Sequence, residues 1–352
     1  MPRLALVAAL FASYAAPVRG QCNGSPALCE RGYGTVSFVG THNSYAVGSE
    51  DNLAVNQGHD VTQQLNDGVR MLQVQAHTKG TTIQLCHTSC DLLDGGSLLD
   101  YLRKVKTWMD ANPQEVVSML IVNIRNQPPT AFSSIFTQAG LADLAYTPVA
   151  PSVAVADWPT LGSMIESGKR LVIFMDNQAQ YDVVSWIIDE FSNMWETGFN
   201  IVDPTLFNCQ VNRTSGDPST QLALINHFLN QVVVSFPAPF PERANVTNAA
   251  TGEGSLGAEV GVCGEVIGRA PNFMLVDFYE YGGGSVFEVA ASANGVTYNP
   301  TTPIAQPGGS SGGSTNGAGG TGTRDSAAAS VFVPGSWMVS SLVLGGLGAA
   351  LL

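Results

Sequence analysis

The chain has 352 residues, of which 45% are hydrophobic and 12% are charged. This balance excludes a largely disordered chain and predicts a sizeable globular core. The formal net charge of −13 disfavours nucleic acid as a partner, because polyanions are repelled and no run of lysine and arginine is present. An anionic substrate would therefore need a local positive site.

The N-terminus is typical of a secreted protein. Residues 1–20 hold a basic residue, an apolar run and small residues before the expected cleavage site, which is the pattern of a secretory signal peptide. A buried first helix is the alternative interpretation. The run is too short to span a membrane, which also favours the signal peptide.

Six cysteines lie after residue 20, and an even number in a secreted chain favours disulfide bonds. Fifteen pairings are formally open, and the spacing favours local ones. Asn-X-Ser/Thr sequons predict glycosylation in the same extracellular setting. The favoured pairs are Cys22–Cys29, Cys86–Cys90 and Cys209–Cys263, and the sequons lie at Asn23, Asn212 and Asn245.

The C-terminus carries the pattern of a lipid-anchored protein. Residues 298–330 form a linker rich in glycine, serine and threonine, and residues 331–352 are an almost wholly apolar anchor signal. Asn316 and the two small residues after it provide an attachment site for a glycosylphosphatidylinositol (GPI) anchor. A single membrane-spanning helix is the alternative, but no basic cluster follows the apolar run. We therefore expect a secreted protein that is tethered to the membrane at the cell surface.

Between the two ends, apolar runs and helical periodicity alternate along the chain. The best defined helix is expected at residues 97–111, where Leu98, Leu102, Val105 and Met109 recur on one face. Expected strands span residues 35–39, 69–74, 79–86, 116–122, 171–175 and 273–278, and further helices span 61–66, 161–167, 178–195, 220–230 and 282–293.

The alternation of short buried strands and helices predicts a single α/β domain with a parallel sheet over residues 21–297. Its length suits a (β/α)8 (TIM-type) barrel, since such domains run to ~250 residues. An open doubly wound sheet is the alternative. It is less favoured because no glycine fingerprint follows the first expected strand.

Polar residues lie at the ends of several expected strands. His42 follows the first, Gln75 and His77 end the second, His87 ends the third and Asp277 ends the last. In a parallel barrel the C-terminal ends of the strands form one face, so these side chains are expected to converge. Two histidines and a carboxylate suit cleavage of a phosphodiester. One imidazole would remove a proton from the attacking hydroxyl, and the other would protonate the leaving oxygen.

Several segments between about residues 30 and 295 occur in the order typical of one family. The segments are Gly40–Ser44, Gly68–Leu72, His87 after Leu85, Leu92–Leu98, Asn112–Val117, Ser167–Leu171 and Pro271–Phe278. They resemble the phosphatidylinositol-specific phospholipase C X-domain superfamily, and more specifically the fungal secreted phospholipase C-like phosphodiesterases.

The resemblance implies a (β/α)8 barrel that hydrolyses a phosphoinositide-like phosphodiester. It makes His42 the general base, His87 the general acid and Asp277 the carboxylate that supports His42. Asn43 matches a calcium-ligand position of relatives, and Asn123 is expected to line the substrate pocket beside it. No cofactor is expected, with weak use of Ca²⁺ left open.

Two glutamines depart from the superfamily pattern. Relatives carry acidic residues, or an acid and an arginine, at the positions of Gln73 and Gln75, and an amide supplies no charge to a phosphoryl group. Lys79 and Arg70 are the nearest candidates for a replacement cation at the substrate, although Arg70 could equally form an ion pair at the bottom of the barrel. A catalytically weak or inactive barrel that binds a lipid headgroup or the cell wall is the alternative function. A metal-dependent phosphodiesterase is a third, for which no acidic metal set is visible.

The other histidines and a zinc interpretation receive less weight. His59, His77 and His227 are expected to be structural or on the surface. The cysteines that flank His87 would suit zinc only with a fourth ligand, and secretion favours a disulfide between them.

Overall fold

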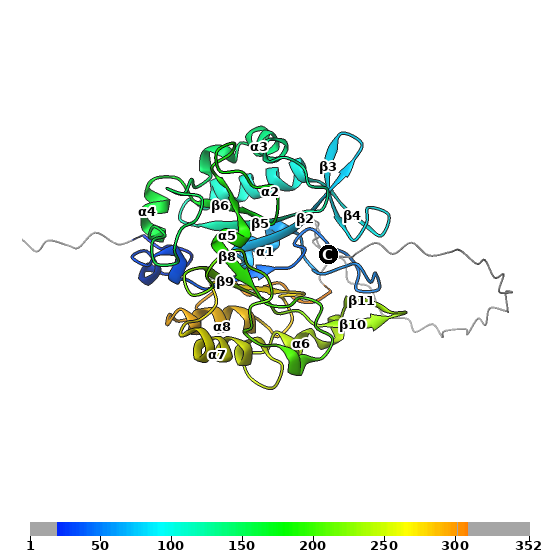
Figure 1. Cartoon of the computed structure of the whole chain (residues 1–352). Coiled ribbons are helices and arrows are strands. Elements are labelled where there is room, and N and C mark those ends of the chain that lie inside the picture. Colours follow the sequence, from blue (N-terminus) through cyan, green and yellow to red (C-terminus); the bar gives the residue numbers. More distant parts are fainter. Residues whose placement is uncertain (1–19, 301, 309–352) are drawn as a thin grey trace, which may run out of the picture. The chain divides into compact units, whose positions relative to one another are not determined.

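A curled parallel sheet forms the centre of the protein in the computed structural model, which describes residues 20–300 and 302–308. The eight parallel strands of this part of the chain are β1 (Phe38–Thr41), β2 (Met71–Lys79), β5 (Val117–Asn123), β6 (Leu171–Met175), β7 (Ile187–Asp189), β8 (Met194–Glu196), β9 (Leu222–Asn226) and β12 (Phe273–Val276). Their order is β7-β6-β5-β2-β1-β12-β9-β8, and each hydrogen-bonded pair is parallel. The sheet curls, with helices around it, in the expected (β/α)8 barrel architecture (Figure 1).

The two edge strands of this sheet are consecutive in the chain. β7 ends at Asp189 and β8 begins at Met194, and only the four-residue helix α5 (Glu190–Asn193) lies between them. Hydrogen bonds join β7 to β6 and β8 to β9. The covalent chain therefore connects the two edges at the point where the described sheet has no ladder of hydrogen bonds.

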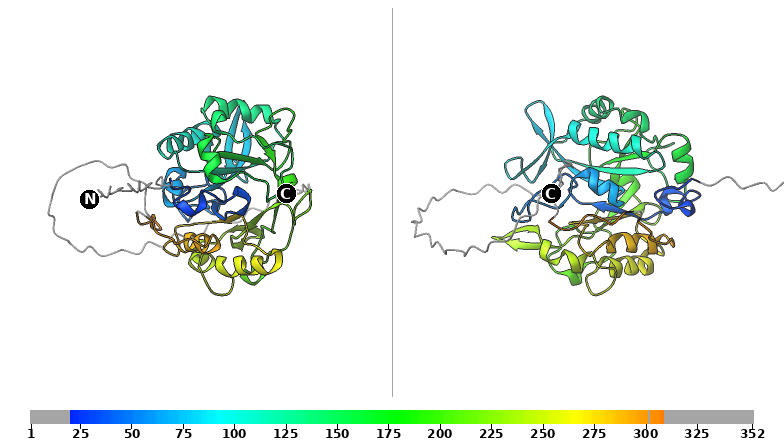
Figure 2. Two further views of the ribbon diagram at one scale, coloured as in Figure 1. Left: turned by 90° about the vertical axis from the view of Figure 1, so that its left-hand side faces the viewer. Right: turned by 180° about the vertical axis from the view of Figure 1, so that it is seen from behind.

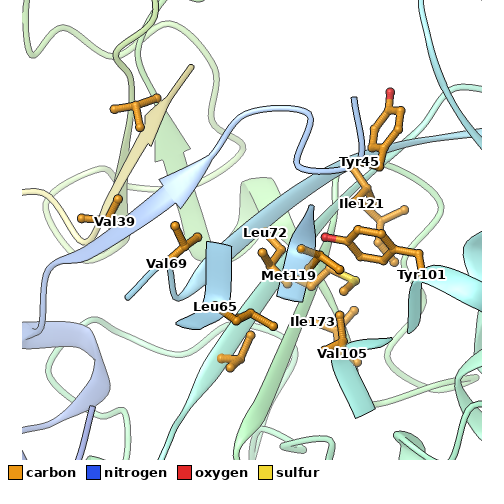
Figure 3. Packing of buried hydrophobic residues seen from close by; sticks show 14 of the residues in the cluster. Val39, Tyr45, Leu65, Val69, Leu72, Tyr101, Val105, Met119, Ile121 and Ile173 are labelled. Carbon is orange, nitrogen blue, oxygen red and sulfur yellow. The ribbon is translucent and has the colours of Figure 1, made fainter. Parts of the chain in front are cut away.

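Helices pack on the outside of the sheet and bury a broad apolar layer. Figure 3 shows part of it, where Leu65 and Val105 from two helices approach Leu72 of the sheet. Ser97 caps the second helix as expected, because its hydroxyl accepts a hydrogen bond from the Asp100 amide. The helices are α1 (Val61–Asp67), α2 (Leu98–Ala111), α3 (Pro129–Gln138), α4 (Leu161–Glu166), α6 (Ala244–Thr247), α7 (Leu256–Ile267) and α8 (Ser285–Ala293), with 3-10 turns at Pro26–Leu28, Tyr33–Thr35, Ala142–Leu144, Pro204–Leu206 and Pro241–Arg243.

Inward-facing side chains fill the barrel beneath its C-terminal end. Phe38, Met71, Phe273 and Leu275 are buried in one apolar cluster. Gly40 of β1 permits this close packing, because a Cβ at that position would lie 2.6 Å from Cδ2 of Leu275 and 2.9 Å from Cβ of Met71. The strand that leads into the loop of the first catalytic candidate is thereby held close to both of its neighbours.

Two expected helices are wrong. Residues 178–195 contain β7, α5 and most of β8, and residues 220–230 contain β9. All five residues of β9 are buried, and a short apolar run that is buried on every side has no periodicity to separate a strand from a helix. The helices α3 and α7 lie in segments where the pattern predicted no element.

A second correction concerns the third expected strand. It is β3 (Thr82–His87), which runs antiparallel to β2 and continues into β4 (Leu93–Ser97). It therefore extends β2 as a hairpin and is not a barrel strand. β10 (Asn230–Val233) and β11 (Phe236–Pro239) form another hairpin, and both hairpins project from one side of the barrel (Figures 1 and 2). No helix within the described ranges is long and apolar enough to cross a membrane.

The features expected of a secreted chain lie partly within the described residues. The structure contains the disulfides Cys22–Cys29, Cys86–Cys90 and Cys209–Cys263, the pairs that the spacing favours. Asn212 and Asn245 are exposed, whereas the Asn23 side chain exchanges two hydrogen bonds with the main chain of Val116. Asn316 and residues 331–352 lie outside the described residues, as does nearly all of the predicted signal peptide.

Candidate active site

His42 and Asp277 lie side by side because they follow neighbouring parallel strands. Thr41 at the end of β1 pairs with Val276 at the end of β12, and the His42 amide donates a hydrogen bond to the Val276 carbonyl (3.0 Å). This register brings His42 Nδ1 to 2.9 Å from Asp277 Oδ1. Because a carboxylate accepts hydrogen bonds, Nδ1 carries the ring proton and Nε2 keeps its lone pair.

Two amides of the loop after β1 support this pair, and neither has a specific signal in the sequence. Asn56 Nδ2 lies 3.1 Å from each Asp277 oxygen. Gln57 Nε2 donates to the carbonyls of His42 (2.8 Å) and Val276 (3.0 Å). Both side chains are buried. Amides are also common in ordinary turns, so their presence in an Asn- and Gly-rich loop does not indicate a role at a site.

Asn43 contacts both Gln73 and the His42 imidazole. Asn43 has a φ of 44°, which is unusual for a residue other than glycine. Its amide donates to Gln73 Oε1 (2.6 Å), and its Nδ2 lies 3.0 Å from His42 Nε2. Gln73 therefore uses its side-chain carbonyl to hold the turn that carries His42.

His87 reaches the same place by a different route from the one expected. The antiparallel strand β3 runs back toward the barrel, and His87 is its last residue. The ring centroids of His42 and His87 are 6.3 Å apart, with an interplanar angle of 81°. His87 Nδ1 donates to the Ala54 carbonyl (2.7 Å), which leaves Nε2 free of that bond. Burial lowers the pKa of His87, the Ala54 carbonyl opposes this, and the nearby His42 adds to the lowering.

Three further candidates lie at the C-terminal ends of β2 and β5. Gln75 is half-buried on the same face of β2 as Gln73. His77 is buried, and its Nε2 has no hydrogen-bond partner among the described residues. Asn123 uses its side chain to donate to the Gln127 carbonyl (2.9 Å), so it stabilises the turn after β5. Of the remaining histidines, His59 contacts the Gln306 carbonyl and His227 pairs with Glu259, which fits a structural role for both.

The two expected replacement cations do not join the histidines. Arg70 precedes β2 and lies at the opposite end of the barrel, where its Nε donates to Glu115 Oε2 (2.8 Å) and its guanidinium lies over the Trp108 ring. The expectation that Arg70 binds substrate is wrong, and the alternative of an ion pair at the barrel bottom holds. Lys79 ends β2 far along the hairpin, is 61% exposed and pairs with Asp94. No contact in the described residues brings it to His42.

A second polar layer lies where β7, β8 and β9 end. Glu196 forms an ion pair with Arg213 and accepts a hydrogen bond from Asn226 Nδ2 (2.9 Å). Glu190 is buried, and its Oε1 has no hydrogen-bond partner in the described ranges. Burial raises the pKa of both carboxyl groups, and repulsion from Glu196 raises that of Glu190 further. The sequence pattern did not predict this layer, because Glu190 and Asn226 lie in segments that were expected to be helices.

The arrangement as a whole can transfer two protons at one place. His42 offers an unprotonated Nε2, and His87 offers Nε2 from a ring that stands nearly perpendicular to it. An oxygen–phosphorus–oxygen group placed between the two rings could contact both. Within the described residues, no group of three or more His, Cys, Asp or Glu side chains is arranged to hold a metal ion.

A solved structure shares this fold. A double mutant of the phosphatidylinositol-specific phospholipase C from Staphylococcus aureus matches with a TM-score of 0.50 and 15% sequence identity, over 76% of this chain and 95% of that chain. The same enzyme from Listeria monocytogenes matches with a TM-score of 0.49 and 14% identity, over 74% of this chain and 94% of that chain.

Sequence relatives are found among fungal proteins. One from Arthroderma benhamiae, named "Uncharacterized secreted protein", is 45% identical over 288 residues, which are 79% of this chain but only 65% of the relative's length. Another from the same fungus, named "PI-PLC X domain-containing protein 1", is 41% identical over 278 residues, or 78% of this chain and 90% of that protein. The family model described as PI-PLC X 1 matches residues 28–294. The chain therefore belongs to the PI-PLC X domain family.

Proposed function

We propose that this protein is a phosphoric diester hydrolase of phospholipase C type that cleaves a phosphoinositide-like phosphodiester. The mutual placement of His42 and His87 carries the proposal, because their ring centroids are 6.3 Å apart and the rings are nearly perpendicular. Two imidazoles at this separation suit a general base and a general acid on either side of one phosphorus. Asp277 supports His42 by fixing its tautomer, as carboxylates do in other histidine-based hydrolases.

In the proposed reaction, His42 Nε2 removes the proton of a substrate hydroxyl while its oxygen attacks phosphorus. That hydroxyl would take the place of the Asn43 amide, which lies 3.0 Å from Nε2. His87 Nε2 gives a proton to the leaving oxygen as the phosphorus–oxygen bond breaks, while the Ala54 carbonyl holds Nδ1. This step leaves a phosphodiester that includes the attacking oxygen and a free alcohol, and the two histidines have exchanged protonation states. Hydrolysis is completed when His87 Nε2 removes a proton from water as the water oxygen attacks phosphorus, and His42 Nε2 returns its proton to the departing oxygen.

A non-catalytic barrel that binds a lipid headgroup or the cell wall is the second candidate. One observation favours it: no side chain of β2 supplies positive charge beside the histidines. Gln73 is engaged with Asn43, and both Arg70 and Lys79 pair with carboxylates elsewhere. Without a cation, negative charge that develops on the phosphoryl oxygens is less well stabilised.

A substrate screen separates the two candidates. The purified protein would be assayed on phosphatidylinositol, glycerophosphoinositol and phosphatidylcholine, with and without a chelator. We expect hydrolysis of the inositol diesters, and His42→Ala or His87→Ala should each lower kcat by roughly 10²–10⁴-fold. His59→Gln is the matched control, since His59 contacts the Gln306 carbonyl outside the pair. Its activity should equal that of the wild type, and the unfolding midpoint of each variant would confirm the fold.

Two results would overturn the hydrolase proposal. The first is turnover in either histidine variant at the wild-type rate. The second is a wild-type protein that cleaves none of the diesters, and binding of an inositol headgroup without cleavage would then support the second candidate. Activity that is lost when the chelator is added would show that a bound cation takes part in the reaction.

We also infer that the mature protein is secreted and held at the cell surface by a GPI anchor at Asn316. The C-terminal sequence pattern supports this inference, and one fungal relative is named as a secreted protein. The last described residues pack on the barrel: Ile304 is buried, and the Gln306 carbonyl lies 3.0 Å from His59 Nε2. Only residues 309–315 separate this packed segment from the proposed attachment site.

A further inference from the structure

The ring of Phe228 lies flat against the ring of His42. The two ring centroids are 3.8 Å apart and the planes are within 2° of parallel, which is the closest ring contact in the described part of the chain. Phe228 follows β9, is only 4% exposed and belongs to the apolar cluster that fills the barrel. One face of the imidazole is thus covered by an aromatic hydrocarbon ring.

Residues on both sides of Phe228 in the chain are fixed by hydrogen bonds. The preceding residue, His227, is buried, with Nδ1 2.5 Å from Glu259 Oε2 and Nε2 2.8 Å from the Thr247 carbonyl. Its amide also donates to a carbonyl of β12. On the other side, the Asn230 amide donates to a carbonyl of an earlier loop (2.8 Å). With the chain fixed on both sides, the phenyl ring restrains the imidazole and does not simply follow it.

The hydrogen-bonding contacts of His42 lie at the edge of its ring. Nδ1 lies 2.9 Å from Asp277 Oδ1 and 3.2 Å from Asn56 Nδ2, and Nε2 lies 3.0 Å from Asn43 Nδ2. Hydrogen bonds tolerate a spread of angles, so these edge contacts alone leave the ring a range of tilts about its Cβ–Cγ bond. A flat contact on one face narrows that range. When His42 takes a proton, the ring also becomes a cation above an aromatic face, and that arrangement is attractive.

We propose that Phe228 is a positioning residue for the general base: it fixes the plane of the His42 ring and stabilises the imidazolium that forms when His42 accepts a proton. The kinetic part rests on the proposed function, whereas the effect on the ring does not. Simple packing is a different explanation with a different outcome. Leucine fills much of the same volume without an aromatic face, so it would preserve the packing and lose the positioning.

Kinetics test the first half of the proposal. Phe228→Leu should lower kcat roughly 3- to 30-fold with little change in KM, and Phe228→Tyr should retain most of the activity. The loss should persist on a phosphodiester with a nitrophenyl leaving group, because nitrophenolate needs no proton to depart. The loss caused by His87→Ala should largely disappear with that substrate. In a His42→Ala background, Phe228→Leu should have no further effect. Equal rates for the leucine and tyrosine variants, at equal unfolding midpoints, would overturn the proposal.

A second measurement does not depend on turnover. The ¹³C relaxation of the His42 Cε1–H group reports how freely the ring moves. The wild type and Phe228→Tyr should show a rigid ring, and Phe228→Leu should show added ring motion, while Asp277 keeps the proton on Nδ1 in all three. Unchanged ring motion in Phe228→Leu would overturn the positioning role whether or not a substrate is cleaved. The expected change in ring motion without any hydrolysis would overturn only the proposed function.

Discussion

Neighbouring side chains set the orientation of the His42 imidazole. Asp277 accepts from Nδ1, and Asn56 holds both oxygens of that carboxylate. Asn43 marks the position at which a hydroxyl proton would meet Nε2. A general base needs the correct tautomer as much as it needs a nearby charge, so the contribution of Asp277 can be measured separately from that of His42.

The first prediction concerns this carboxylate. Asp277→Asn keeps the shape of the side chain but allows the wrong His42 tautomer, so kcat should fall by roughly 10²–10⁴-fold while the fold is retained. Steady-state kinetics with an unfolding curve would measure both effects. Asp94→Asn is the control, because the described partners of Asp94 are Lys79, Gln84 and Gly96 of the hairpin. Similar kcat values for the two variants would contradict the role of Asp277.

The second prediction is a pH dependence set by His87. Burial lowers its pKa from the ordinary value of 6.5, with the Ala54 carbonyl opposing and His42 and His77 adding to the lowering. A general acid must be protonated, and the protonated fraction falls as the pH rises through the pKa. The alkaline limb of kcat/KM should therefore begin below pH 6.5. A phosphodiester with a nitrophenyl leaving group should lack this limb. If kcat/KM on a natural diester still rises above neutral pH, His87 is excluded as the general acid.

At the scale of elements, the hairpin built from β2, β3 and β4 is what delivers the second histidine. β2 runs past the barrel, and β3 returns along it, with Ala76 opposite Leu85. The disulfide between Cys86 and Cys90 brackets His87 at the end of β3. The position of His87 thus depends on the pairing of β3 with β2, on a short closed loop and on the contact with the Ala54 carbonyl.

The third prediction tests this loop. The double variant Cys86→Ser/Cys90→Ser should lower kcat by roughly 10- to 100-fold, because His87 loses its fixed position. It should also lower the free energy of unfolding by about 2 kcal/mol, the value expected for closing so short a loop. Cys22→Ser/Cys29→Ser is the matched control, since it opens another short loop and leaves the histidines untouched. Equal kcat losses in both double variants would show that the effect is not specific to His87.

How far the sequence predicted the elements depended on the signal that each element carries. The cap of α2 and its apolar face are local features, and they gave that helix to within a residue. The segment of β9 failed because a short, mostly apolar run suits a helix equally well, and the segment of β7 failed because Val183, Trp186, Ile187 and Phe191 recur at helical spacing. The direction of β3 was also out of reach, because a strand pattern has the same period whichever way the strand runs.

At the scale of the whole molecule, the barrel lies between the predicted signal peptide and the proposed attachment site. The described segment 302–308 packs on the barrel, with Ile304 buried and the Ala305 amide bonded to Asp67. A chain that ends at Gly308 would therefore keep every described contact of the barrel. The barrel can therefore be tested apart from the proposed anchor in a single experiment.

The fourth prediction uses that separation. In a fungal host, the full chain should sediment with membranes and be released by an enzyme that cleaves GPI anchors. A chain that ends at Gly308 should appear in the medium with an unchanged kcat on a soluble diester. Immunoblots of membrane and medium fractions would measure the distribution. Full-length protein that resists release but is extracted by detergent would support the membrane-spanning alternative.

The sequence by itself determined what can be expressed locally or by the order of segments. The family and the two histidines were indicated by the Gly40–Ser44 loop, the His87 segment and the segment that ends in Asp277. The spacing of the cysteines predicted the disulfide pairs. Each of these signals lies within a few residues, so it can be recognised before any contact across the chain is known.

Only the tertiary structure decided the contacts between distant segments. It places Arg70 at the far end of the barrel. It also shows that Asn56 is hydrogen-bonded to Asp277 and that the Phe228 ring stacks on the His42 ring. None of these has a local signature, since an arginine before a strand, an asparagine in a loop and a phenylalanine after an apolar run are all common. Strand direction and register determine which of them meet, and these are properties of the folded sheet and not of any one segment.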